Sequence, residues 1–356
     1  MSRRQEQFSG TREVSPPLRF DPEPLEEYMA SHIEGFQGPL TVKQFKGGQS
    51  NPTYLLISKS GKYVLRRKPP GKLLKSAHAV DREFRVISAL YAADFPVPRP
   101  FVLCRDEGVV GTIFFIMEFV EGRIFWDLDL PECGRGERQE IYDNANQTIA
   151  DLHNFNVEEL GLSDYGKPGN YFARQISRWT RQYLASEIEN IADMHRLIEW
   201  LPENIPDDDS ISVVHGDFRL DNMIFHENQP KVLAVLDWEL STIGHPLGDF
   251  TYHMMTWQMP GIGIGSSGLV GKDLIALGIP SEDEYLETYC NRTGRVSGIG
   301  NRNFYSAYNF FRLAAILQGI AGRVRDGTAA SAHAEDAGRA VLPLAELGWQ
   351  FVKKSR

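Results

Sequence analysis

The chain has 356 residues, of which 42% are hydrophobic and 11% aromatic, and its net charge is −9 with a pI near 5.6. This length exceeds one ordinary core, so two lobes are expected. The acidic balance argues against nucleic-acid binding, which needs a basic face. No apolar run has the length of a membrane span, so we expect a cytoplasmic protein. The three cysteines form no Cys-x-x-Cys pair, so we expect no zinc site.

The N-terminal part predicts a leader followed by a small sheet. Residues 1–17 contain arginines and serines but also acids, which indicates a flexible leader. A short helix is expected within 18–38, and strands at 40–45 and 54–57. The loop between these strands is either a plain hairpin turn or a loop whose backbone N–H groups approach phosphates. In the second case the nucleotide-binding candidates are Gly47, Gly48, Gln49, Ser50 and Asn51.

The next strand, over 63–68, carries candidate cations. Side chains alternate along a strand, so Arg66 and Lys68 share one face. One of them is expected to contact nucleotide phosphates; Arg66 is favoured and Lys68 is the second choice. A helix is predicted over 77–90, and its Glu83 is either a solvated charge or the partner of the strand cation.

A link between two lobes, 18–120 and 121–356, is predicted after strands at 101–105 and 112–117. The backbone groups of Glu118, Phe119 and Val120 are candidates to contact an adenine edge. The second lobe predicts helices at 137–153, 172–200, 282–290 and 302–325, the last apolar nearly all round. Asp249 is expected to cap a helix and brace the structure, and the glycine-rich segment 260–271 is either a lid or a loose loop.

The pattern His-Gly-Asp-x-x-x-x-Asn at 215–222 carries the chemistry. Asp217 would accept the proton of an acceptor hydroxyl, while Asn222, with Asp237 after the next hairpin, would hold Mg²⁺. The hairpin is expected to bring Asp237 beside Asn222. His215 is interpreted as structural. Arg219 is either a surface arginine or a group that stabilises charge on the transferred phosphate.

These motifs, in this order, resemble the aminoglycoside phosphotransferase family over about residues 35–325. Segments 48–54, 63–74 and 76–83 are similar to the kinase-like domain fused to some acyl-CoA dehydrogenases (members ten and eleven of that family). The resemblance implies an α+β, bilobal protein-kinase-like fold with a small antiparallel-sheet lobe bearing one helix and a larger helical lobe. It also implies ATP as donor and a small-molecule acceptor, which for the fused relatives is implied to be a 4-hydroxyacyl-CoA or similar hydroxy acid. We expect a monomer or homodimer.

The sequence therefore predicts an ATP- and Mg²⁺-dependent kinase for a small hydroxylated metabolite. One alternative is an antibiotic kinase, whose acceptor cleft would be acidic; the acids at 207–209 are interpreted as solvated surface. A basic cleft near Arg174, Arg178 and Arg181 would instead favour an anionic acceptor. A nucleotide-binding pseudokinase is the second alternative. Trp238-Glu239 after the metal Asp, where protein kinases have Phe-Gly, argues against a switching activation segment.

Overall fold

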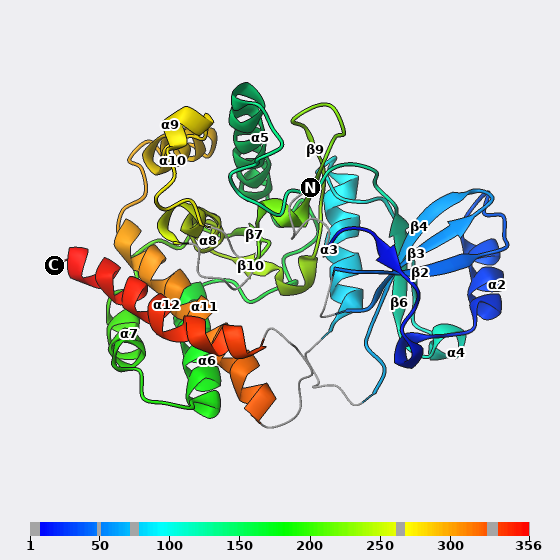
Figure 1. The fold of residues 1–356 in the computed structure, drawn as a ribbon, viewed down its shortest axis with the longest axis horizontal. Helices are drawn as coiled ribbons and strands as arrows, with labels where there is room; N and C mark the ends of the chain where they lie inside the picture. Colours follow the sequence, from blue (N-terminus) through cyan, green and yellow to red (C-terminus); the bar gives the residue numbers. More distant parts are fainter. Residues whose placement is uncertain (1–7, 48–50, 72–77, 261–267, 326–333, 356) are drawn as a thin grey trace. The chain divides into compact units, whose positions relative to one another are not determined.

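The computed structural model describes residues 8–47, 51–71, 78–260, 268–325 and 334–355. The chain packs as two compact units, each drawn in Figure 1. The sheet unit comprises Met1–Trp126, Leu160–Leu162 and Arg219–Ser241, and the helical unit comprises Asp127–Glu159, Ser163–Phe218 and Thr242–Arg356. The predicted α+β class is confirmed, because one unit is built on an antiparallel sheet and the other is mainly helical.

The sheet unit contains a six-stranded antiparallel sheet in the order β1-β2-β3-β4-β6-β5 and a separate β8-β9 hairpin. Its strands are β1 (Thr11–Arg12), β2 (Thr41–Phe45), β3 (Thr53–Ser58), β4 (Gly61–Arg67), β5 (Pro100–Cys104), β6 (Phe114–Glu118), β8 (Met223–Phe225) and β9 (Val232–Val235). Its helices are α2 (Pro22–His32), α3 (Val80–Ala92) and α4 (Glu107–Val110), with short 3-10 turns η1 (Pro16–Leu18), η2 (Leu220–Asn222) and η3 (Trp238–Leu240).

Within its described residues, the helical unit contains a two-stranded antiparallel ribbon, β7 with β10, which carries the His-Gly-Asp segment at the end of β7. The strands are β7 (Ser212–Val214) and β10 (Thr242–Gly244). The helices are α5 (Arg135–Asn154), α6 (Tyr171–Ser186), α7 (Ala192–Glu203), α8 (Pro246–Gln258), α9 (Leu274–Leu277), α10 (Glu282–Arg292), α11 (Arg302–Arg325) and α12 (Ala334–Lys354).

Strand alternation gives the two faces of the large sheet different partners. One face packs its apolar side chains against Leu25 and Met29 of α2. The opposite face lies toward α3, so the two helices cover opposite faces (Figure 1). Adjacent arginines on β4 therefore point to opposite sides: Arg67 donates to the Val110 and Leu18 carbonyls, while Arg66 contacts Glu83 of α3. This alternation places Arg66, and not its neighbour, beside α3.

Several boundaries differ from the sequence-based expectation. Thr11–Arg12, inside the segment expected to be a flexible leader, pairs with β2. The helix expected from residue 77 begins at Val80, because His78 has a left-handed backbone (φ 63°) and its ring Nδ1 lies 2.9 Å from Asn51 Oδ1. The short helix expected within 18–38 is present as α2, and with α4 the sheet unit has more than the single helix that the resemblance implied.

In the helical unit, the prediction of one continuous helix over 172–200 is wrong. Residues 187–191 separate α6 from α7, and the Glu187 carboxylate in this turn lies 2.7 Å from His195 Nε2 on α7. The helix α12 was not expected at all. The first turn of α8 is capped by the ring of His245, which accepts from the Leu247 N–H, so the prediction that Asp249 is the cap is wrong.

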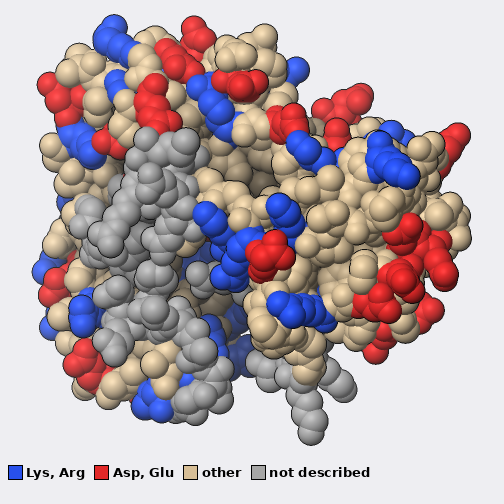
Figure 2. Space-filling model, turned by 45° about the vertical axis from the view of Figure 1, so that its right-hand side comes forward, with Lys and Arg blue, Asp and Glu red and all other residues tan. Residues whose placement is uncertain are grey.

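On the face drawn in Figure 2, acidic and basic side chains are interspersed. None of the helices within the described ranges combines the length and apolar character that crossing a bilayer requires.

Gly122 tests the packing of the segment that follows β6. A Cβ at this position would lie 2.2 Å from the Phe225 carbonyl oxygen, a backbone atom that cannot move aside cheaply. We expect Gly122→Ala to lower the free energy of unfolding by about 1–3 kcal/mol, the usual cost of overpacking. Gly136→Ala in α5 is the control, since a Cβ there meets nothing within 4 Å and alanine favours helix. Chemical denaturation of both variants measures the difference; equal stabilities would contradict the packing argument.

Candidate active site

Part of the predicted phosphate loop, Gly48, Gln49 and Ser50, lies outside the described residues, as do 261–267 of the glycine-rich segment 260–271. The remaining candidates lie in two places. Those before residue 127 and those from Arg219 to Asp237 belong to the sheet unit, and Asp217 belongs to the helical unit. The chain passes from one unit to the other between Phe218 and Arg219, so the predicted joint role of Asp217 and Asn222 in one reaction stays a prediction.

The centre of the sheet-unit site is the buried guanidinium of Arg66. Its Nε lies 2.7 Å from the Glu83 carboxylate, and its Nη2 lies 2.5 Å from Asp237 and 3.4 Å from Glu239. Arg66 is the strand cation that pairs with Glu83. Lys68 lies one residue beyond the end of β4, where its N–H donates to the Ile113 carbonyl and its own carbonyl accepts from the Thr112 hydroxyl.

Three carboxylates around one guanidinium leave the cluster negatively charged. Burial raises the pKa of Glu83 to about 7; the attraction of Arg66 opposes this rise, and the charges of Asp237 and Glu239 add to it. Burial works to lower the pKa of Arg66, but the carboxylates hold it above its ordinary value. The guanidinium therefore stays charged, while one carboxyl group of the cluster can hold a proton near neutral pH.

Asn51 ties the start of β3 to the same cluster. Its side chain is fully buried, and its Nδ2 donates to Glu83 at 2.8 Å and to Glu239 at 3.3 Å. Gly47, four residues earlier, lies close to another part of the unit, because a Cβ there would be 3.3 Å from the Phe8 carbonyl oxygen. The role predicted for this loop involved its backbone; the contacts of the Asn51 side chain were not foreseen.

Asp237 has a strained backbone held by its neighbours. Its φ of 65° and ψ of 59° are left-handed, a conformation that costs free energy in a non-glycine residue and is concentrated at functional sites. The next residue, Trp238, is buried, donates from its ring N–H to the Val235 carbonyl and packs edge-on against Phe95. The tryptophan therefore anchors the turn that presents the Asp237 carboxylate.

The β8-β9 hairpin brings Asn222 and Asp237 close along the backbone, as the sequence predicts. The Leu236 N–H donates to the Asn222 carbonyl at 2.8 Å, one residue before Asp237. Arg219, at the start of this segment, forms an ion pair with Asp221 at 2.5 Å, and its side chain is 41% exposed. The structure thus shows a local carboxylate contact for Arg219, and its predicted role toward a phosphate stays a prediction.

The backbone groups proposed to contact an adenine lie just after β6. Glu118 is the last residue of β6, and its N–H already donates to the Arg99 carbonyl at 2.9 Å. Phe119 stacks on Phe45 with ring centroids 6.3 Å apart. Among the described residues, none accepts a hydrogen bond from the N–H of Val120. The N–H of Val120 is therefore better placed than that of Glu118 to donate to a ligand.

In the helical unit, a buried carboxylate holds the loop that carries Asp217. Asp249 accepts from the N–H groups of His215 and Gly216 at 2.7 and 2.8 Å. Burial would raise its pKa, but the contacts with His153 and His215 hold the pKa of Asp249 below its ordinary value. Gly216 has a φ of 86°, which explains why glycine stands in the motif. The prediction that Asp249 is a structural brace is confirmed by these contacts.

Two histidines complete the support of this loop. The His215 ring accepts from the Asp217 N–H at 3.1 Å, in agreement with its predicted structural role. Burial lowers the pKa of His253 to about 4, so its ring is neutral at pH 7. Its Nδ1 lies 3.2 Å from the Phe218 carbonyl and its Nε2 2.8 Å from the Tyr285 hydroxyl, which assigns the proton to Nδ1.

Sequence reasoning missed two residues next to Asp217. The Tyr252 hydroxyl donates to Asp217 Oδ1 at 2.8 Å, and Arg312 donates to the Gly216 carbonyl at 2.5 Å. Tyr252 follows Asp249 by three residues in α8, so helical spacing could have placed both on the side facing the loop. Arg312 interrupts the apolar helix α11, and a charge in such a helix is the feature that could have drawn attention to it.

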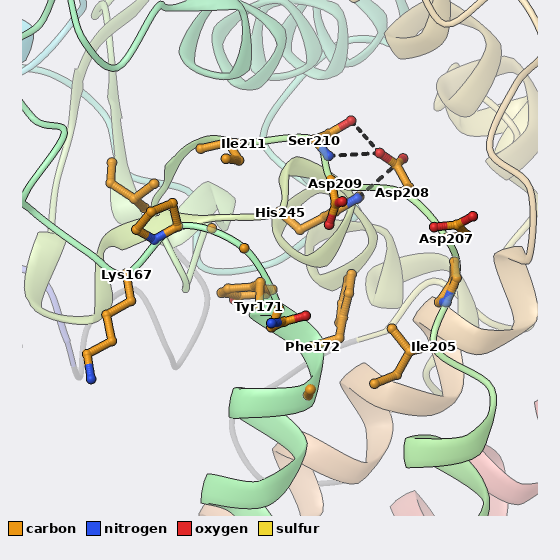
Figure 3. Close-up of a pocket in the computed structure, with 17 residues that line it drawn as sticks. Lys167, Tyr171, Phe172, Ile205, Asp207, Asp208, Asp209, Ser210, Ile211 and His245 are labelled. Atoms are coloured by element: carbon orange, nitrogen blue, oxygen red, sulfur yellow. Dashed lines mark hydrogen bonds and ion pairs between the residues drawn. The ribbon is translucent and has the colours of Figure 1, made fainter.

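A cavity of about 310 Å³ lies elsewhere in the helical unit, beside the amino end of β7 (Figure 3). Asp207, Asp208 and Asp209 line it. Asp208 is not a solvated charge, since it accepts from the Ser210 N–H at 2.9 Å and lies 3.2 Å from Arg295. Because Asp217 follows the carboxyl end of β7, these acids and Asp217 are at opposite ends of the strand.

The three arginines considered for a basic cleft make local contacts. Arg174 donates to the Lys167 and Gly169 carbonyls, Arg178 lies over the Trp179 ring, and Arg181 donates to the Ser177 carbonyl. A basic acceptor cleft near these arginines stays a hypothesis.

Two features define the class of protein. The antiparallel sheet carries a buried arginine that pairs with a helix glutamate, and the helical unit braces a His-Gly-Asp loop. The protein is a small-molecule phosphotransferase of the protein-kinase-like fold, with an alcohol group as acceptor.

Comparison with known proteins identifies the family. Residues 41–266 match the phosphotransferase enzyme family, and the chain belongs to it. It is 43% identical to acyl-CoA dehydrogenase family member 11 of Pongo abelii over 98% of this chain, but it spans 45% of that relative's length.

Solved structures agree with this assignment. A crystal structure from Ralstonia eutropha JMP134, provisionally named an aminoglycoside phosphotransferase, is 53% identical with a TM-score of 0.86, covering 94% of this chain and 99% of that one. Choline kinase from Cryptosporidium parvum is 12% identical with a TM-score of 0.66, covering 94% and 97%, and so shares the fold.

The raised pKa of Glu83 predicts a pH-dependent stability. An ordinary Glu has a pKa near 4.3, so between about pH 4.5 and 7 the folded protein keeps a proton that the unfolded chain has lost. The free energy of unfolding contributed by this group therefore falls as pH rises through that window. Glu83→Gln cannot ionise, so its melting temperature should improve relative to the natural chain between pH 5 and 8. Glu203→Gln, at an exposed position, should show no such trend; parallel pH dependences for all three proteins would contradict the cluster's electrostatics.

Proposed function

We propose that this chain transfers the γ-phosphoryl group of ATP to a hydroxyl of a small anionic metabolite, such as a hydroxyacyl-CoA or a free hydroxy acid. The observation that carries the proposal is that one buried strand arginine, Arg66, contacts both Glu83 and Asp237. Kinase-like enzymes join a strand cation that binds phosphates, a helix glutamate that orients it and an aspartate that binds metal. The same three kinds of group meet here.

Each sequence candidate has a role in this proposal. Arg66, oriented by Glu83, contacts the α- and β-phosphates, with Lys68 close to the same strand end. The loop of Gly47 to Asn51 covers the phosphates with backbone N–H groups, and Arg219 neutralises charge on the transferred group. The Glu118 carbonyl and the Val120 N–H bind the adenine edge beside Phe119.

Mg²⁺ fits the donor set that the hairpin provides. A carboxylate from Asp237 and an amide oxygen from Asn222 are the hard oxygen ligands that Mg²⁺ prefers, and few protein ligands suffice when phosphates and water complete the shell. Among the described residues, no group of three or more His, Cys, Asp or Glu side chains is placed to hold a metal ion. When bound, the metal would neutralise phosphate charge.

The reaction is a direct in-line transfer. The acceptor oxygen forms a bond to the γ-phosphorus while the bond from that phosphorus to the bridging oxygen of ADP breaks, and Asp217 takes the acceptor's proton. ADP leaves with the bridging oxygen. The products are ADP and a phosphate monoester of the acceptor.

Charge near Asp217 supports an anionic acceptor over an antibiotic polycation. A buried cation, Arg312, donates to the Gly216 carbonyl next to Asp217 and adds positive charge there. The acids at 207–209 line the cavity at the other end of β7. The curated relatives also carry the name acyl-CoA dehydrogenase, and a hydroxyacyl-CoA acceptor matches the thioester chemistry that this name implies.

The test is ADP release by purified protein with Mg-ATP against hydroxyacyl-CoAs, hydroxy acids, choline-like alcohols and aminoglycosides. We expect turnover with a hydroxyacyl-CoA or hydroxy acid. Asp217→Asn should reduce it by about 10²–10⁴-fold, the usual contribution of a general base, while Mg-ATP still raises the melting temperature. Asp207→Asn, an exposed acid in the same unit, is the matched control and should keep full activity.

Three results would contradict parts of this proposal. Turnover of aminoglycosides alone would exclude the anionic acceptor, and unchanged turnover by Asp217→Asn would exclude the assigned base. Binding of Mg-ATP without transfer to any acceptor would favour the pseudokinase alternative.

A further inference from the structure

The Asp217 side chain is held by a tyrosine that lies outside the His-Gly-Asp motif. Tyr252 of α8 donates its hydroxyl to Asp217 Oδ1 at 2.8 Å. The last torsion of an aspartate is broad, so a carboxylate without a directional partner samples many orientations. A phenol held by a helix restricts that rotation. Tyr252 therefore helps to fix the direction in which the Asp217 carboxylate points.

Arg312 of α11 fixes the backbone next to the same residue. It is 5% exposed, and its Nη2 donates to the carbonyl of Gly216, directly before Asp217. Its guanidinium lies 4.8 Å from the centroid of the Tyr252 ring and 5.9 Å from that of Trp179. Among the described residues, no carboxylate lies within ion-pair distance of Arg312. Burying a cation without such a partner is costly, and aromatic faces offset only part of the cost.

The electrostatics of Arg312 also involve Asp217. Burial works to lower the pKa of Arg312, but the phenols of Tyr308, Tyr171 and Tyr252 and the carboxylate of Asp217 hold it above its ordinary value. The cation and Asp217 are thus close enough to interact, although they form no direct ion pair.

The helices that supply these groups are tied to each other. Asn309, one turn before Arg312 on α11, donates to the Thr251 hydroxyl at 2.8 Å and to the Gly248 carbonyl at 3.3 Å, both on α8. Asp249, Tyr252 and His253 follow one another on α8 at helical spacing, and each contacts the loop between His215 and Phe218. The loop is therefore held by a rigid pair of helices.

We propose that Tyr252 and Arg312 are positioning residues for Asp217: the phenol orients the carboxylate, and the guanidinium fixes the loop and the tyrosine ring. This inference rests on the proposed function, in which Asp217 takes the acceptor's proton. An in-line transfer requires the base and the acceptor oxygen to be aligned, and a displacement of about 1 Å can cost about 10²-fold in rate. The two residues act through Asp217, not on the phosphates.

Tyr252→Phe tests the orientation directly, because it removes one oxygen and keeps the ring under Arg312. We expect kcat to fall about 10- to 100-fold while KM for ATP stays within about twofold, since the nucleotide is bound elsewhere. Tyr142→Phe is the matched control: it removes another buried tyrosine hydrogen bond in the same unit, to the Leu128 carbonyl. The control should lower the melting temperature to a similar degree but keep kcat. Equal kcat in Tyr252→Phe and the natural chain would overturn the role of the phenol.

Arg312→Lys and Arg312→Met test the guanidinium. Lysine keeps the charge and can still donate to the Gly216 carbonyl, so we expect it to retain several-fold more kcat than methionine, which keeps only the bulk. Rescue by lysine supports positioning by a hydrogen-bonded cation. If both variants fold and have the natural kcat, or if methionine is the more active, the role of Arg312 is wrong.

A double-mutant cycle separates this inference from the proposed function. In an Asp217→Asn background, Tyr252→Phe should cause no further loss of turnover, because its partner carboxylate is already gone. An additional loss as large as in the natural chain would show that Tyr252 acts independently of Asp217 and would overturn the inference. If Asp217→Asn alone keeps full turnover, the assignment of Asp217 as the base in the proposed function fails whatever Tyr252 does. If Asp217→Asn is inactive and Tyr252→Phe is normal, the inference about Tyr252 fails alone.

Discussion

Burying one guanidinium among three carboxylates is the constraint on which the sheet unit depends. A charge without solvent must be paired, and Arg66 takes its partners from α3 and from the turn after β9. Helix, strand and hairpin are therefore fixed to one another at a single point. Asp237 has a left-handed backbone at that point, and the contact with Arg66 and the buried ring of Trp238 offset its strain.

In the helical unit, the comparable constraint is that the backbone polar groups of one loop need hydrogen-bond partners. The loop that carries Asp217 leaves β7 without a further strand to pair with, so its N–H groups and carbonyls need other partners. Asp249 accepts from two of the N–H groups, while His253 and Arg312 take two of the carbonyls. Most of these partners come from one side of α8. A helix presents such groups at fixed spacing, which makes the loop's shape a property of α8 rather than of the loop itself.

The family assignment and the site support each other but answer different questions. Membership of the phosphotransferase enzyme family defines the type of reaction, whereas the acceptor that we propose follows from the charges around Asp217. The chain spans 45% of the length of its relative from Pongo abelii, so the activity of that whole protein is not carried over with the fold. Within this chain, the buried cation beside the loop and the separation of the acids at 207–209 from Asp217 are the features that bear on the acceptor.

The sequence by itself determined the α+β class, most strands, and the motif that places Asp217, Asn222 and Asp237, because alternation and turn chemistry are local. It narrowed the strand cation to Arg66 or Lys68. Only the tertiary structure decided that Arg66 meets Glu83, since this depends on where α3 packs. It also decided that Tyr252 and Arg312 adjoin Asp217, that residues 187–191 interrupt a helical pattern, and that Thr11–Arg12 joins the sheet. Such contacts join residues far apart in the chain, and no local pattern of hydrophobicity or propensity encodes which distant groups will meet.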